Sequence, residues 1–231
     1  MRIIYTGCSW AHRSFDTRTG EEEKFTNLAH ELKLNVIDLS QNGSSNRTAI
    51  QRVKKYLLRH PIQNNETIKI ILVYCEPLLD GWSYFNYNNQ DKFLRDLVHD
   101  NHWKDTRDEI NDKNLKEISD LHLDIGLIGG HSDIYNNNND LKIIHPSWQH
   151  ALAEEQCHNF IGWGCEVMHR VIVEQPNINP NKSLVNEIIK TFSAWRQLET
   201  HNVFNFVHPN TKGNVYFANQ ISNNIHTWID N

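Results

Sequence analysis

The sequence predicts an α/β protein, a three-layer α/β/α sandwich built on a parallel sheet. Two observations predict this class. Short apolar segments alternate with amphipathic segments along the whole chain, and this alternation is typical of parallel strands joined by helices. The segment 68–75, IKIILVYC, is a near-continuous run of apolar residues, as a central strand buried on both faces requires.

Five segments are expected to be strands of this sheet, and a sixth is short and semi-extended. The first strand is broken by Gly7 and Cys8, so that Ser9 is expected in a loop at its carboxyl end. The strands are expected at 2–6, 35–39, 68–75, 123–130 and 141–144, with the semi-extended segment at 203–207.

Helices are expected where apolar residues recur at a spacing of three or four. The first has acidic residues in its first turn, where the helix dipole favours negative charge. Pro61 is expected to stop the second, and Ser183 to cap the sixth. The expected helices cover 21–32, 49–57, 91–98, 106–121, 149–173, 184–195 and 211–229.

The bulk properties limit the class of protein. A chain of 231 residues is expected to form one domain, 1–231, with a helical or loop insertion at about 78–121. The net charge of −5 argues against a broad surface for nucleic acid. Without a spanning apolar run or a signal peptide pattern, a cytoplasmic protein with no membrane partner is expected. The four cysteines lack paired spacing, which indicates reduced thiols.

Three polar segments follow expected strands and are candidates for a site. They are Gly7-Cys8-Ser9, the segment 42–46 (NGSSN) and the segment 205–210 (NFVHPN). Because the carboxyl ends of parallel strands meet at one edge of a sheet, these segments are expected to converge. Ser9 would supply a hydroxyl nucleophile and His208 an imidazole to accept its proton, with the backbone amides of Ser9 and Gly43 facing the developing oxyanion.

These three segments resemble sequence blocks of the SGNH hydrolase superfamily, the GDSL-type esterases and lipases. Cys8 stands where the family's first block has Asp, and Gly213 follows the last block closely. The resemblance spans almost the whole chain and implies a flavodoxin-like sheet. It implies Ser9 and His208 as catalytic residues with Asn205 orienting the imidazole, and an oxyanion and substrate-binding set of Ser9, Gly43 and Asn46.

Two features depart from the family pattern. Asn205 stands where the family has an Asp three residues before the His. An Asn holds an imidazole but does not stabilise the imidazolium by charge, and the Asp to Asn change in a serine protease triad lowers turnover by about 10⁴. Glu199 and Asp133 are alternative carboxylates by position. The strand 68–75 also lacks the following Asn of the family's third block, for which Asn86, Asn88, Asn89 and the segment 129–133 are alternatives.

The resemblance implies a serine esterase that needs no cofactor and acts on an ester, for example an O-acetyl group, of a small polar or carbohydrate substrate. The alternative is a weak or inactive SGNH-fold protein that binds a glycan or a protein partner. A carboxylate within about 3 Å of the His208 ring would favour the enzyme. A Rossmann-type nucleotide binder is disfavoured because no strand is followed by G-x-G-x-x-G.

Other candidate groups are expected to be structural. Four histidines (131, 145, 150 and 158) match no short ligand spacing in a chain with 14 His, so no metal site is expected. Cys8 is expected to be a small packing residue. The aromatic residues at 82–87 have no basic residues among them and are expected to fold onto the core rather than bind nucleic acid. The sequence does not predict the oligomeric state.

Overall fold

The computed structural model describes residues 1–12, 27–41, 44–75, 77, 103–130, 134, 141–146, 204–205, 208–209 and 211–231. Its strands are β1 (Arg2–Gly7), β2 (Ile37–Asp38), β3 (Ile68–Tyr74), β4 (Asp124–Gly129), β5 (Lys142–His145), β6 (Phe204–Asn205) and β7 (His208–Pro209). Its helices are α1 (Ser9–His12), α2 (Leu28–Glu31), α3 (Asn46–Arg59), α6 (Trp103–Ser119) and α10 (Thr211–Asp230).

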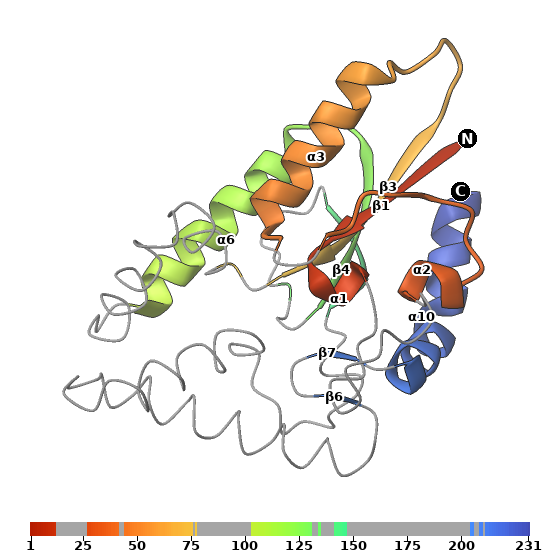
Figure 1. Ribbon diagram of the computed structural model, residues 1–231. Helices are drawn as coiled ribbons and strands as arrows, with labels where there is room; N and C mark the ends of the chain where they lie inside the picture. Colours follow the sequence, from red (N-terminus) through yellow and green to blue (C-terminus); the bar gives the residue numbers. More distant parts are fainter. Residues whose placement is uncertain are drawn as a thin grey trace, which may run out of the picture.

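Five parallel strands form the central sheet in the order β2-β1-β3-β4-β5. This is the flavodoxin-like order of a doubly wound sheet. The helices α3 and α6 cover one face of the sheet, and α2 and α10 cover the other (Figure 1). The predicted three-layer α/β/α class is therefore confirmed.

The central strand β3 explains why the sheet has two covered faces. All seven of its residues are buried, and its neighbours β1 and β4 pair with it in register at Ile70, opposite Ile4 and Ile125. Alternate side chains of a strand point to opposite faces, so Ile70 and Ile71 belong to different cores. A strand with apolar residues on both faces is stable only between two layers of helices.

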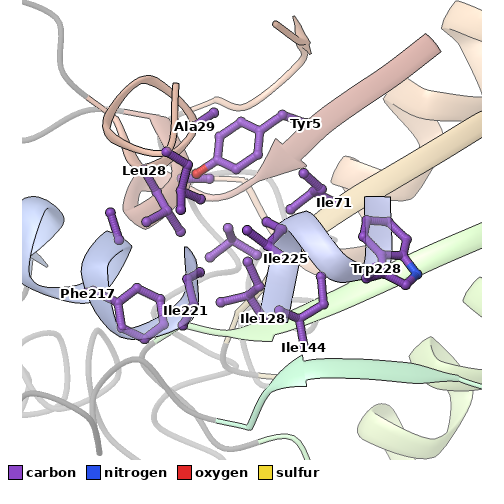
Figure 2. Close-up of a cluster of buried hydrophobic side chains, with 14 of the residues drawn as sticks. Tyr5, Leu28, Ala29, Ile71, Ile128, Ile144, Phe217, Ile221, Ile225 and Trp228 are labelled. Carbon is purple, nitrogen blue, oxygen red and sulfur yellow. The ribbon is translucent and has the colours of Figure 1, made fainter. Parts of the chain in front are cut away.

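One of the two cores lies between the sheet and α10. Its apolar side chains come from α2, α10 and one face of four strands, as the labelled residues of Figure 2 illustrate. Phe217, Ile221 and Ile225 recur at helical spacing on α10 and are completely buried, which accounts for the predicted helix at 211–229. Fully burying a side chain of this size contributes about 1.5–3 kcal/mol.

The other core lies under α3 and α6. Ala49, Ile50 and Val53 of α3 pack with Leu115 and Ile118 of α6 against the sheet. The part of the expected insertion at 103–119 is therefore a helix packed on the sheet, in the crossover from β3 to β4. Residues 78–102 of that insertion lie outside the described residues.

Several boundaries differ from the expected ones for local reasons. The helix expected at 49–57 begins at Asn46, because Ser45 accepts a hydrogen bond from the Thr48 amide and Thr48 caps Ser45 in return. The helix expected at 106–121 ends at Ser119, and His122 then takes a positive φ of 50°. Of the semi-extended segment expected at 203–207, the structure describes Phe204–Asn205, which form β6 and pair antiparallel with β7.

Other expected helices fall partly or wholly outside the description. Of the helix expected at 21–32, the structure describes Leu28–Glu31, which Asn27 caps by accepting from the His30 amide. The helices expected at 91–98, 149–173 and 184–195 lie outside the described residues.

Candidate functional site

The turn after β1 depends on Gly7. Its φ is +152°, and a Cβ there would lie 2.7 Å from the Val73 carbonyl oxygen and 2.8 Å from the Ala11 Cβ, so the position favours glycine. The Cys8 carbonyl then accepts from the amides of Ala11 and His12, at 3.0 and 3.1 Å. Ser9 therefore begins the short helix α1, and the prediction that it lies in a loop is wrong.

Cys8 lies between the strand and this helix and is buried, with 1% of its surface exposed. Its side chain belongs to the core on the α10 side of the sheet. This burial agrees with the expected packing role for Cys8.

The second polar segment is tied to the end of β3 by Asn46. This residue is completely buried. Its side-chain amide donates to the Cys75 carbonyl at 2.9 Å, and its side-chain oxygen accepts from the Cys75 amide at 2.6 Å. Asn46, expected to bind substrate or the oxyanion, thus holds the backbone where β3 ends. Gly43 lies outside the described residues.

Arg52 of α3 connects the end of β1 to the chain that follows β2. Its guanidinium donates to the Leu39 carbonyl at 2.7 Å and to the Gly7 carbonyl at 3.1 Å. Burial lowers the pKa of Arg52 from its usual value, although nearby Cys75, Cys8 and Asp38 act in the opposite direction. The Arg52 guanidinium is thereby fixed beside the chain segments that follow β1 and β2.

The last polar segment reaches the same edge of the sheet. In the pair β6–β7, Asn205 lies directly opposite His208, so the two candidate residues are neighbours across an antiparallel ladder. The strand β7 contacts α1, the helix that begins at Ser9. The backbones that carry Ser9 and His208 are thus brought together from opposite ends of the chain. The side chains of Ser9, Asn205 and His208 lie outside the described part.

Several alternatives from the sequence also lie outside the described residues. They are Asn86, Asn88, Asn89, His131, Asp133, His150, His158, Glu199 and the aromatic residues of 82–87. The carboxylate expected near His208 therefore stays a prediction. His145 is described, and its ring packs edge-on against Phe217 with centroids 5.1 Å apart.

Sequence reasoning missed a polar cluster at this edge. Asp38 ends β2, Ser40 follows it by two residues, and His12 ends α1, and these three side chains are linked by hydrogen bonds. A signal was present, because Asp38 and Ser40 follow an expected strand and His12 lies three residues after Ser9.

The opposite edge of the sheet carries a cavity of about 650 Å³. It is lined by residues at or near the amino ends of strands, including Lys69, Asp124 and Lys142, and by Trp228 in the last turn of α10. In parallel sheets of this type ligands bind at the carboxyl ends of the strands. The candidate site is accordingly placed at the edge with Ser9 rather than at this cavity.

Two general features are absent from the described residues. No helix among them is long and apolar enough to cross a membrane. Within the same ranges, no three His, Cys, Asp or Glu side chains gather in a way that could hold a metal ion.

Strand order and direction define the chain as a doubly wound, flavodoxin-like α/β protein with a polar carboxyl edge. No protein-family model matches the sequence, and no curated protein matches it. Solved structures that match include the crystal structure of the protein YXIM from Bacillus subtilis, with 10% identity and a TM-score of 0.41. The match covers 98% of this chain but 56% of that one, so this chain spans little more than half its length.

Proposed function

We propose that this chain is a serine hydrolase of the SGNH type that cleaves an ester of a small polar or carbohydrate substrate, such as an O-acetyl group. The observation that carries the proposal is the contact between α1, which begins at Ser9, and β7, which begins at His208. These two residues occupy the positions of the nucleophile and the base in the SGNH sequence pattern.

The chemistry is a two-step acyl transfer. The Ser9 hydroxyl attacks the ester carbonyl carbon, its proton passes to His208, and the backbone amides of Ser9 and Gly43 stabilise the oxyanion. The imidazolium then gives the proton to the departing alkoxide, and the alcohol leaves. Water attacks the acyl-enzyme with the same base, which releases the acid and restores Ser9.

The fixed backbone of the turns after β1, β2 and β3 supports this assignment of roles. Gly7, Asn46 and Arg52 fix the backbones on either side of the proposed nucleophile and oxyanion donors, and such preorganisation is what oxyanion stabilisation requires. Asn205 opposite His208 would orient the imidazole, but as a neutral side chain it would not stabilise the positive charge of the protonated ring. We infer an ester rather than an amide substrate because an alkoxide leaves more readily than an amine.

The test is labelling of the purified protein with a fluorophosphonate probe, which reacts with activated serines. We expect the wild type to be labelled and both Ser9→Ala and His208→Ala to lose labelling. Ser119→Ala is the matched control, because Ser119 ends α6 just before the amino end of β4, at the other edge of the sheet. This variant should be labelled as fast as the wild type.

A folded wild type that does not react would overturn the enzyme proposal. The protein would then be an SGNH-fold binding protein for a glycan or a protein partner, which the Asn at position 205 favours. Circular dichroism of each variant establishes that lost labelling does not reflect unfolding.

A further inference from the structure

The cavity at the amino edge of the sheet is lined by β5, by the amino ends of β3 and β4, and by the last two turns of α10. Its volume of about 650 Å³ falls in the range of about 300–1,000 Å³ in which proteins bind small molecules. It lies at the opposite edge of the sheet from Ser9. A ligand in this cavity would therefore not be the substrate of the proposed hydrolase.

The strand register places three charged residues on the face of the sheet that α10 covers. Lys69 of β3 lies directly opposite Asp124 of β4, and Lys142 of β5 lies opposite Gly126. Alternate residues of a strand share a face, so residues 124 and 126 face the same side. A Cβ at Gly126 would lie 3.1 Å from Cη2 of Trp228 on α10, which identifies that side. The three charged residues accordingly line the same cavity.

The acceptors beside this cavity are already used within the fold. The Asp124 carboxylate accepts from the Trp228 indole through Oδ1 at 3.0 Å, and its Oδ2 lies 3.0 Å from the Lys69 ammonium. Lys69 also donates to the Trp228 carbonyl at 2.6 Å. The Asn231 side-chain amide donates to the Thr227 carbonyl at 2.7 Å. These carboxylate and carbonyl oxygens are therefore occupied before a ligand binds.

Two ammonium groups keep donors for a ligand. The Lys69 side chain is 5% exposed, and the Trp228 carbonyl and Asp124 take two of its three protons. Lys142 is exposed and has no hydrogen bond or ion pair within the described part of the chain. With two ammonium groups and one carboxylate, the described lining side chains carry an excess of one positive charge. This charge attracts an anion, and it is screened least at the buried Lys69.

The apolar part of the lining favours an organic anion over an inorganic one. Ile143, Ile144 and Trp228 contribute apolar surface to the cavity, and Figure 2 labels two of them, on β5 and at the end of α10. The Lys69 ammonium lies 5.0 Å from the centroid of the Trp228 ring, so the indole and the buried charge are adjacent. A molecule with a carboxylate at one end and a short apolar body at the other matches both kinds of lining.

We propose that this cavity binds a small organic monocarboxylate. The ligand carboxylate accepts from the Lys69 and Lys142 ammonium groups, and its apolar part packs against Ile143, Ile144 and Trp228. A single carboxylate matches the single excess positive charge of the lining. This binding site is separate from the catalytic edge and adds a function beyond the proposed hydrolysis.

The test is a titration of the purified protein with three probes of similar shape and different charge, namely benzoate, benzamide and benzylammonium. The readout is the indole ¹H–¹⁵N signal of Trp228, which the Trp228→Phe variant identifies. We expect benzoate to shift this signal in a saturable way. The neutral and cationic probes should bind about 10-fold more weakly or worse, because charge-assisted hydrogen bonds are roughly twice as strong as neutral ones.

Lysine variants test the residues that hold the carboxylate. Lys142→Met should weaken benzoate binding about 10-fold, because it removes one of the two charged donors. Since Lys142 is exposed, this variant is expected to stay folded. The matched control is Lys55→Met, an exposed lysine on α3, which covers the other face of the sheet. It should bind benzoate as tightly as the wild type.

Three results would overturn the inference. The first is a Trp228 signal that benzoate does not shift in the folded protein. The second is benzylammonium binding as tightly as benzoate, which would contradict an anion site. The third is equal benzoate affinity in the wild type and Lys142→Met, or an equal loss in Lys55→Met. None of these measurements depends on an activated Ser9, so they are independent of whether the chain is a hydrolase.

Discussion

The two edges of the sheet use polar side chains in different ways. At the amino edge, charged side chains pair with each other. Arg2 forms two hydrogen bonds with the Glu66 carboxylate, at 2.9 and 2.7 Å, and Lys69 lies 3.0 Å from Asp124. At the carboxyl edge, Asn46 and Arg52 instead hold backbone carbonyls of the turns.

The polar groups of the amino edge connect elements of the fold to one another. The Lys69 ammonium also donates to the Trp228 carbonyl at 2.6 Å, and the Trp228 indole donates to Asp124 at 3.0 Å. These groups satisfy one another and attach α10 to the sheet. The polar groups of the carboxyl edge fix where the chain runs after β1, β2 and β3, next to Ser9, the candidate nucleophile.

The largest effect is expected at the carboxyl edge, from Asn46→Ala. The change leaves the buried amide and carbonyl of Cys75 without this partner and should lower the free energy of unfolding by about 3 kcal/mol. Urea unfolding measures it, with the exposed Asn64→Ala as control, expected within about 0.5 kcal/mol of the wild type. A loss below about 1 kcal/mol would show that Cys75 finds other partners.

The next effect tests the amino edge, from Lys69→Met. Losing the buried ammonium should cost about 2 kcal/mol, less than for a fully buried pair, because the Asp124 side chain is 44% exposed. The exposed Lys142→Met is the control. Labelling of the folded fraction should be unchanged in both variants. Slower labelling of folded Lys69→Met would break the distinction between the edges.

A smaller stability loss with a clear loss of reactivity is expected from Arg52→Lys. An ammonium keeps the charge but cannot donate hydrogen bonds to both the Gly7 and the Leu39 carbonyl as the planar guanidinium does. The free energy of unfolding should therefore fall by about 1 kcal/mol. Because the turn before Ser9 loses the hydrogen bond from residue 52 to the Gly7 carbonyl, the labelling rate should fall more than the small loss of folded protein alone would cause. The control is Lys54→Arg on the same helix, measured by the same unfolding and labelling experiments. Equal labelling rates of the wild type and Arg52→Lys would contradict the proposed role of Arg52 in positioning the turn before Ser9.

The smallest effect at neutral pH is expected from Tyr5→Phe. The buried Tyr5 hydroxyl has no hydrogen-bond partner within the described part of the chain, so its removal should change stability by less than about 0.5 kcal/mol.

At alkaline pH the same substitution should become visible. Burial, with smaller contributions from Asp38 and Cys8, raises the pKa of Tyr5 well above its usual value. Above about pH 10 the unfolded phenol loses a proton that the folded one keeps, so stability falls as pH rises. Tyr5→Phe should lose less stability than the wild type between pH 9 and pH 11, measured by urea unfolding. The exposed Tyr216→Phe should follow the wild type.

The sequence by itself determined the layers of this protein. The apolar, β-branched run IKIILVY in β3 is typical of a central strand, and Phe217, Ile221 and Ile225 repeat at the period of a helix with one buried face. These are local patterns, readable from neighbouring residues. The three polar segments were also recognisable, because each follows an expected strand.

Tertiary structure alone decided which residues meet. The hydrogen bonds between Asn46 and Cys75, and the one between Ser40 and His12, join parts of the chain that are distant in sequence. No periodicity records such pairs, since they depend on the order in which parallel strands assemble. That α1 begins at Ser9 likewise follows from the Gly7 turn against Val73, a contact that exists only once β1 and β3 are paired.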